Sequence, residues 1–212
     1  MKTVPSQKTL KSNLRKDMRQ KRAGMDNDRR QTWDAAINRH LLDYAERQQP
    51  RVITAFMAFD GEPDLVPAMT LLNERGVRLA LPVIHEEPGR SVISFRQWSP
   101  DSELINNRFG IAEPQGTQEI LLGDIDLALI PLVAWEKSGG RLGMGASFYD
   151  RLFQPFAGLA RPVRMGVGYQ LQQAEQIPLE PWDIRMHMML SELGCLNALN
   201  EELNIELLAD QE

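Results

Sequence analysis

The chain has little cysteine and histidine and no long apolar run. Its 212 residues include one cysteine, Cys195, and three histidines. A lone cysteine excludes an internal disulfide, and three scattered histidines do not supply a typical zinc site. No apolar stretch reaches the roughly 20 residues that cross a bilayer, so no membrane association is expected. The first residues also lack the apolar core of a signal peptide, which together with the single cysteine predicts a cytoplasmic protein.

Two familiar phosphate-binding motifs and a basic overall charge are absent as well. The sequence contains neither G-x-x-x-x-G-K-[ST] nor G-x-G-x-x-G. Its formal charge is −5, so a nucleic-acid partner is not expected. With 42% apolar and 25% charged residues, the composition is that of an ordinary globular protein.

The most informative stretch runs from Asp126 to Arg151. It begins with an apolar run, residues 127–135, of the kind found in a strand buried on both faces. A glycine-rich segment with Arg141 follows, and then a helical pattern over residues 148–156. Strand, glycine loop and helix in this order bring backbone N–H groups to a phosphate. A glycine-rich segment in this place is also common as a plain tight connection, and the pattern alone leaves both readings open.

Resemblance to a known family bears on that choice. The string GGRLGMGASFYDR is similar to the G-x-R-L-G-x-G-x-G-x-Y-D-R signature of the 5-formyltetrahydrofolate cyclo-ligases, also called methenyltetrahydrofolate synthetases. The resemblance extends from Lys11 to about Glu192. It implies cyclisation of 5-formyltetrahydrofolate to 5,10-methenyltetrahydrofolate through a phosphorylated formyl group. ATP and Mg²⁺ are the implied cofactors, and ADP and phosphate the implied by-products.

The same resemblance implies roles for individual residues. Positive charge for catalysis would come from Lys11, Arg15 and Arg141. The implied nucleotide-binding residues are these three together with Leu142, Gly143, Met144, Gly145, Ala146, Ser147, Phe148 and Tyr149. The implied folate-binding residues are Met57, Glu62, Met144, Phe148 and Tyr149. Asp150 and Asp183 would hold the metal ion.

Residues 8–23 predict a basic N-terminal helix. Leu10, Leu14 and Met18 recur every four residues and would form one apolar stripe. Lys11 and Arg15 share another face, because they too lie four residues apart. Without the resemblance, this helix is equally a solvated basic surface or one that contacts an acidic polymer.

The remaining pattern predicts one α/β domain over residues 1–212. Strand candidates at 51–59, 77–84, 91–98, 127–135 and 161–169 alternate with helices and one hairpin. We expect three layers, with a mixed, mainly parallel central sheet flanked by helices, and a monomer. The acidic tail at about 199–212 is given no function.

Several departures from the family pattern keep alternatives open. Trp135-Glu136 stands where relatives usually have Phe-Asp, Ser147 where the last glycine is expected, and His187 where an aspartate is common. A catalytically weak nucleotide- or folate-binding regulator on the same fold is therefore the second hypothesis. The third is nucleic-acid binding through Lys16, Lys21 and Arg22 of the basic helix. Glu113 is either functional or a turn residue held before proline.

Overall fold

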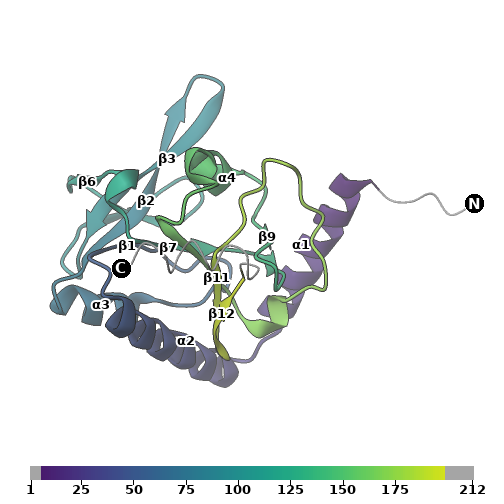
Figure 1. The fold of residues 1–212 in the computed structure, drawn as a ribbon, viewed down its shortest axis with the longest axis horizontal. Coiled ribbons are helices and arrows are strands. Elements are labelled where there is room, and N and C mark those ends of the chain that lie inside the picture. Colours follow the sequence, from purple (N-terminus) through teal and green to yellow (C-terminus); the bar gives the residue numbers. More distant parts are fainter. Residues whose placement is uncertain (1–5, 199–212) are drawn as a thin grey trace, which may run out of the picture.

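The computed structural model describes residues 6–198, and the acidic tail predicted at 199–212 lies outside them. Its centre is a mixed sheet with the strand order β12-β11-β10-β7-β1-β2-β3-β6 (Figure 1). The strands of this sheet are β1 (Val52–Thr54), β2 (Arg78–Glu87), β3 (Arg90–Trp98), β6 (Glu119–Ile120), β7 (Leu127–Pro131), β10 (Val163–Val167), β11 (Met188–Ser191) and β12 (Gly194–Asn197).

The middle of the sheet is parallel and its edges are antiparallel. Strand β7 lies between β1 and β10, and all neighbours from β11 to β2 run in the same direction. Strands β12, β3 and β6 pair antiparallel with their neighbours. The predicted fold class, a mixed and mainly parallel sheet, is confirmed.

Alternation along the central strands divides the core into two layers. Ile53, Leu127 and Leu129 pack on one face with α2 (Asn27–Gln48) and α3 (Val66–Glu74). Val52, Ala128 and Ile130 face the other way and pack with α4 (Phe148–Phe153) and the segment before β11. Such alternation is expected because successive side chains of a strand point to opposite faces. Figure 1 shows α2 and α3 below the sheet and α4 above it.

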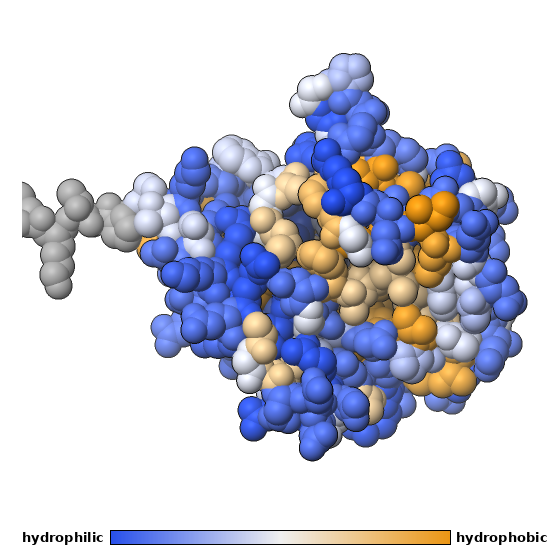
Figure 2. All heavy atoms as spheres, turned by 180° about the vertical axis from the view of Figure 1, so that it is seen from behind, coloured by the Kyte–Doolittle hydropathy of each residue, from blue (hydrophilic) through white to orange (hydrophobic). Residues whose placement is uncertain are grey.

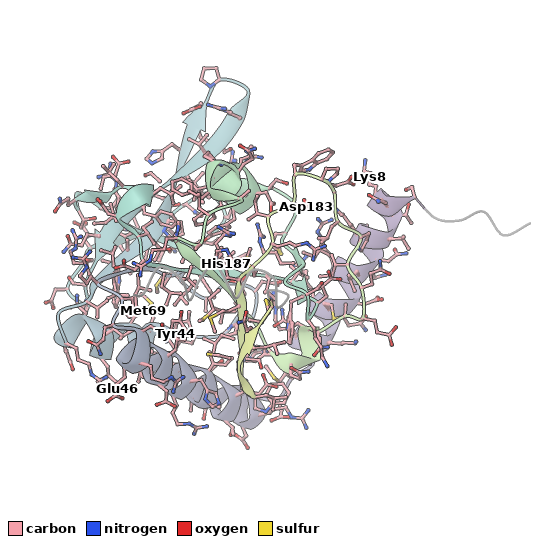
Figure 3. All side chains as sticks on the ribbon, in the orientation of Figure 1. Lys8, Tyr44, Glu46, Met69, Asp183 and His187 are labelled. Carbon is pink, nitrogen blue, oxygen red and sulfur yellow. The ribbon has the colours of Figure 1, made fainter. Side chains whose placement is uncertain are left out.

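The second helix, α2, buries one stripe of apolar side chains. Ile37, Leu41 and Tyr44 are buried on α2, and Trp33 is partly buried against the same cluster. Figure 3 shows Tyr44 and Met69 pointing into the layer between the helices and the sheet, and Glu46 pointing outward.

The glycine-rich stretch is more complex than the sequence suggested. Strands β8 (Ala134–Trp135) and β9 (Arg141–Leu142) pair antiparallel, so Gly139 and Gly140 belong to the turn of a hairpin. The loop before α4 therefore begins only at Gly143. The predicted helix over 148–156 ends at Phe153, which is also its buried side chain. A separate pair, β4 (Leu104–Asn106) and β5 (Ala112–Pro114), lies beside β2.

The N-terminal helix α1 (Gln7–Ala23) packs on the β8–β9 hairpin. Its Met18 is buried in a cluster with Val133 and Leu142, while Leu10 at the other end of the predicted stripe is 40% exposed. Short 3₁₀ turns complete the fold at Leu122–Asp124, Gln154–Phe156 and Gln170–Gln172. Within residues 6–198, no helix is long and apolar enough to cross a membrane.

His187 is a buried histidine next to a buried arginine. The backbone N–H of Arg164 donates to Nδ1 of His187 at 3.1 Å, and the Arg164 guanidinium contacts the other ring nitrogen. That guanidinium also donates to the carbonyl of Phe156 at 2.8 Å, beyond the end of α4. Burial and the charge of Arg164 lower the pKa of His187 to about 4. His187 is therefore neutral and serves as a packing and hydrogen-bonding group.

We expect the contribution of His187 to stability to depend on pH. Because folding lowers its pKa from the ordinary 6.5 to about 4, the unfolded chain binds the proton first, and stability falls as the pH drops from about 6.5 towards 4. The full loss is about 3 kcal/mol. Urea unfolding of the wild type and His187→Asn between pH 4 and 8 measures it. The wild type should lose stability relative to the variant on acidification, and a pH-independent difference would contradict the assignment.

Candidate functional site

A cavity of about 470 Å³ opens beyond the carboxyl ends of β1 and β7. Phe56 and Met57 follow β1, and Pro131 and Leu132 stand at the end of β7. Such a crevice is the usual place for a ligand in an open α/β sheet. Figure 2, which shows the face opposite that of Figure 1, shows a hollow bordered by apolar side chains beside a strongly hydrophilic region.

The cavity brings together every residue that the sequence singled out for binding or catalysis. The residues concerned are Lys11, Arg15, Met57, Glu62, Arg141, Leu142, Gly143, Met144, Gly145, Ala146, Ser147, Phe148, Tyr149, Asp150 and Asp183. They come from α1, the segment after β1, the β9–α4 loop and the loop before β11. Their individual roles remain predictions, and their common location is what the structure adds.

Three cationic side chains lie along one part of the cavity. Lys11 and Arg15 lie one turn apart on α1, and Arg15 Nε donates to the carbonyl oxygen of Gly143 at 2.8 Å. Arg141 is only 7% exposed, and its Nε has no hydrogen-bond partner within residues 6–198. A buried N–H without a partner costs stability.

The two aspartates predicted to bind metal are each held by one oxygen. Arg141 donates to Oδ1 of Asp150 at 2.8 Å, and the N–H of Ile184 donates to the same atom. Lys11 donates to Oδ2 of Asp183 at 2.8 Å, where the N–H of Glu180 also donates. Within the described chain, Oδ2 of Asp150 and Oδ1 of Asp183 have no hydrogen-bond partner and are available to a cation.

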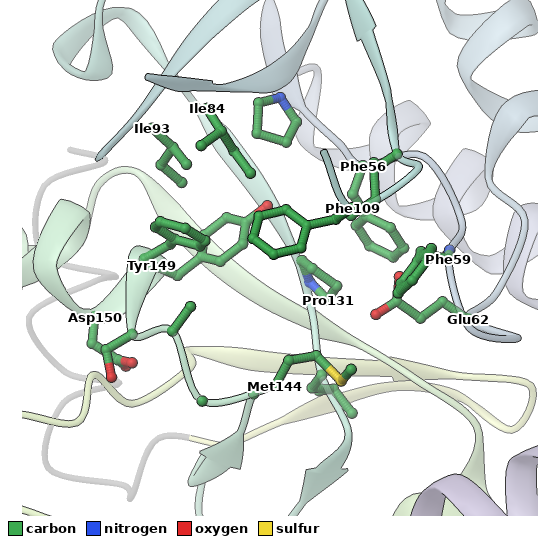
Figure 4. A pocket seen from close by; sticks show the side chains of 18 of the residues that line it. Phe56, Phe59, Glu62, Ile84, Ile93, Phe109, Pro131, Met144, Tyr149 and Asp150 are labelled. Atoms are coloured by element: carbon green, nitrogen blue, oxygen red, sulfur yellow. The ribbon is translucent and has the colours of Figure 1, made fainter. Parts of the chain in front are cut away.

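The opposite part of the cavity is apolar. Figure 4 shows the side chains of Ile84, Ile93, Phe56, Phe109 and Tyr149 gathered in one region, with Glu62 and Asp150 on opposite sides of the view. Flat apolar walls of this kind suit a planar heterocycle, because aromatic faces pack well on it. The cavity thus combines a charged half with a half suited to a ring.

Glu62 lies in a turn that α1 holds in place. The guanidinium of Arg22, which is fully buried, donates to Asp60 at 2.7 Å and to the Leu132 carbonyl at 3.3 Å. Arg19 pairs with the same aspartate from the helix surface. The N–H of Phe59 donates to Oε2 of Glu62 at 3.2 Å. Burial raises the pKa of Glu62 to about 7, and the nearby charge of Arg22 opposes that rise.

Several cavity residues were missed by the sequence analysis. Among them are Phe59, Asn107, Phe109, Ile111 and Trp182, and Glu113 was left undecided. Trp182 is 61% exposed at the cavity. The available signal for Phe109 and Glu113 was the segment FGIAEP, residues 109–114, in which the glutamate directly precedes proline. Trp182 precedes Asp183 directly, and a bulky exposed aromatic next to a proposed ligand was a usable signal too.

The structure alters the interpretation of Glu136 and of the nucleic-acid hypothesis. Glu136 does not line the cavity: its carboxylate accepts from the N–H of Ile177 at 2.6 Å and from Ser138 Oγ at 2.7 Å, so it stabilises the β8–β9 hairpin. The nucleic-acid hypothesis loses Arg22, which is fully buried and paired with Asp60. Lys16 and Lys21 remain exposed, but two lysines are a small basic surface on an acidic protein.

Ser147 adopts a backbone conformation that favours glycine. It precedes α4 with φ 50° and ψ 30°, in the left-handed region, and its side chain makes no capping hydrogen bond. This conformation costs an L-residue on the order of 1 kcal/mol. The loop that borders the cavity is therefore under local strain at the position where the family signature has glycine.

Glycine should be more stable than alanine at position 147. Ser147→Gly relieves the strain, whereas Ser147→Ala retains it, so Gly should exceed Ala by about 1 kcal/mol. At an ordinary negative φ the order would be reversed, because glycine gains more freedom on unfolding. Urea unfolding of both variants gives the difference. An alanine variant as stable as the glycine variant would show that the serine conformation carries no strain.

The comparisons with known proteins agree with the geometry. The sequence profile described as the 5-formyltetrahydrofolate cyclo-ligase family matches residues 7–192. A 5-formyltetrahydrofolate cyclo-ligase of Haemophilus influenzae is 32% identical over 179 residues, which cover 84% of this chain and 95% of that protein. One of Escherichia coli K12 is 34% identical over 170 residues, covering 79% and 92%.

Solved structures are similar as well. The 5,10-methenyltetrahydrofolate synthetase of Aquifex aeolicus has a TM-score of 0.74 at 29% identity and covers 90% of this chain and 94% of its own. The synthetase of Mycoplasma pneumoniae has a TM-score of 0.69 at 23% identity, with 86% and 98% covered, and supports the fold alone. Taken together with the cavity and its residues, these matches show that the chain belongs to the 5-formyltetrahydrofolate cyclo-ligase family.

Proposed function

We propose that the chain uses ATP and Mg²⁺ to convert 5-formyltetrahydrofolate to 5,10-methenyltetrahydrofolate, with release of ADP and phosphate. The observation that carries the proposal is the division of one cavity into a charged half and an apolar half. Lys11, Arg15 and Arg141 suit the phosphates of a nucleotide, and the apolar half suits a reduced pteridine. The family relationship supports the same reaction.

The reaction needs charge and alignment more than covalent help from the protein. The N5-formyl oxygen attacks the γ-phosphorus of ATP and ADP leaves. N10 then attacks the formyl carbon, loses its proton, and the carbon–oxygen bond breaks to release phosphate. Positive charge around the transferring group and in-line placement of the formyl oxygen are the main requirements. Lys11, Arg15 and Arg141 are placed to provide the charge, and the N–H groups of the 143–147 loop are available to the phosphates.

The residues present fit a magnesium ion. Asp150 and Asp183 line the same cavity, and each has one carboxylate oxygen without a hydrogen-bond partner in residues 6–198. No three His, Cys, Asp or Glu side chains gather as a metal cage in that part of the chain. Magnesium does not need one, because it keeps waters and binds substrate phosphates. When bound, it neutralises charge on the phosphates.

The proposed reaction is tested by the absorbance of the methenyl product. Purified protein is mixed with 5-formyltetrahydrofolate, ATP and Mg²⁺, and each of the three is then omitted in turn. A signal that requires all three is the expected result. If both ligands bind but no product forms, the chain is the catalytically weak binder instead, and Ser147→Gly, which restores the family glycine, becomes the next protein to assay.

Asp150 and Glu62 should affect different substrates. We expect Asp150→Asn to lower kcat/KM by about 100-fold or more, because it weakens the binding of Mg·ATP. Glu62→Gln should raise the KM for folate and leave nucleotide binding near the wild-type value. Titration of nucleotide and folate binding separates the two effects, and thermal unfolding shows whether Arg141 tolerates the loss of its partner.

Asp101→Asn is the matched control for both variants, because Asp101 is exposed and does not line the cavity. It should behave as the wild type. Unchanged ATP affinity and turnover in Asp150→Asn would rule out the metal assignment.

A further inference from the structure

Glu113 is a buried carboxylate whose function the proposed reaction does not explain. It lies on β5, opposite Ile105 of β4, and lines the apolar half of the cavity. It is only 6% exposed, and it forms no ion pair with a lysine, arginine or histidine of residues 6–198. A buried carboxylate is costly without a charge partner or hydrogen-bond donors.

One oxygen of Glu113 is firmly held. Oε1 accepts from the N–H of Ile84 at 3.0 Å and from Nδ2 of Asn107 at 2.7 Å. These two donors come from β2 and from the loop between β4 and β5, so the carboxylate is fixed in place before any ligand binds. Asn107 is itself fixed, because its Oδ1 accepts from the N–H groups of Phe109 and Ile111.

The other oxygen of Glu113 is free and accessible. Oε2 has no hydrogen-bond partner in the described part of the chain. In that part of the chain, the polar side-chain atoms that are fully buried and lack a partner are Arg22 Nε, Thr54 Oγ1, Thr117 Oγ1 and Arg141 Nε. Oε2 of Glu113 lacks a partner but is not one of these buried atoms, so part of its surface is accessible. Since the residue is otherwise buried and lines the cavity, Oε2 is the part of the side chain that the open space reaches.

The surroundings restrict what this oxygen can bind. Ile84, Ile93, Phe109 and Ile111 line the same part of the cavity, and Figure 4 shows Ile84 and Ile93 side by side with the rings of Tyr149 and Phe109 nearby. A fixed acceptor in an apolar slot suits a flat ring that carries an N–H donor at its edge. A metal ion is disfavoured, because these four neighbours carry no carboxylate and magnesium needs several oxygens.

We propose that Glu113 recognises the 2-amino-pyrimidine edge of the pteridine ring by accepting a hydrogen bond from the 2-amino group at Oε2. This inference rests on the proposed function, since it assumes a reduced folate in the cavity. Glu113 is then a specificity residue: it favours a 2-amino ring and disfavours a ring with an oxygen at that position. Glu62, on the turn after β1, contacts another part of the substrate.

Glu113→Gln separates recognition from a purely structural role. The amide oxygen can replace Oε1 and keep both bonds from Ile84 and Asn107, so the scaffold is retained. The amide nitrogen replaces Oε2 and turns the free acceptor into a donor. If Glu113 has only a structural role, this exchange leaves that role intact. If Oε2 contacts the 2-amino group, the exchange places the amide N–H donors of the introduced glutamine against the amino N–H donors of the ligand, and the hydrogen bond is lost.

The test is a cycle of two proteins and two ligands. Binding of 5-formyltetrahydrofolate and of its 2-oxo analogue to wild type and Glu113→Gln is measured by calorimetry without ATP. We expect the variant to bind 5-formyltetrahydrofolate about 10- to 100-fold more weakly. It should also lose or reverse the preference of the wild type for the 2-amino ligand. Glu103→Gln, on an exposed residue beside β4, is the matched control and should bind as the wild type.

Each result is decisive. Equal discrimination between the two ligands by wild type and Glu113→Gln would overturn the role of Glu113 and leave the proposed function intact. Failure of the wild type to bind 5-formyltetrahydrofolate would overturn the proposed function, and this inference with it. If Glu113→Gln does not fold, Glu113→Asp takes its place. It keeps the charge but withdraws the carboxylate by one methylene, so weaker binding and weaker discrimination are expected, and wild-type values would overturn the role.

Discussion

The cavity depends on the docking of α1, and that docking depends on a buried charge. The Arg22 guanidinium is removed from water, and Asp60 compensates it at 2.7 Å. Removal of one partner of such a pair would leave an uncompensated charge in the interior, which is strongly destabilising. The pair holds the end of α1 to the turn that carries Glu62. Because Lys11 and Arg15 lie on the same helix, the cationic part of the cavity and the Glu62 turn are positioned together.

A common arrangement recurs at the carboxylates of the cavity. Asp150, Asp183, Glu62 and Glu113 each have one oxygen held by donors of the protein, while the second has no partner in residues 6–198. The held oxygen fixes the rotamer, and the free oxygen is left for a ligand. What differs is that a cationic side chain donates to each aspartate in addition to a backbone N–H, whereas only backbone N–H groups and an amide hold the glutamates. This difference follows the division of the cavity into a charged and an apolar half.

The departures from the family pattern are accommodated in different ways. Glu136 belongs to the β8–β9 hairpin, where it accepts from Ile177 and Ser138 and does not line the cavity. His187 remains neutral against Arg164, whose guanidinium is satisfied by carbonyl oxygens instead of a carboxylate. Only Ser147 retains a cost next to the cavity, because its φ is positive. Of the three, Ser147 is therefore the one with a strained backbone at the cavity.

The sequence by itself determined the elements and the family. Period-two and period-four patterns located the N-terminal helix and the five strands β1, β2, β3, β7 and β10 of the central sheet, because the side chains that face a core repeat with the geometry of the backbone. The signature around Arg141 and Asp150 located the loop, since glycine and charge there are dictated by local conformation and chemistry. The same patterns missed the β8–β9 hairpin, because two-residue strands leave no periodicity to detect.

Only the tertiary structure decided which residues meet. The sequence suggests that Arg22 is one more exposed base of a basic helix, yet it is fully buried and paired with Asp60. The sequence pattern could not show this pair, because Asp60 lies 38 positions away. Glu113 reads as a turn residue before proline, yet the packing of β5 beside β2 leaves its second oxygen open to the cavity. Contacts between distant segments depend on how the elements pack, and a local pattern carries no information about that packing.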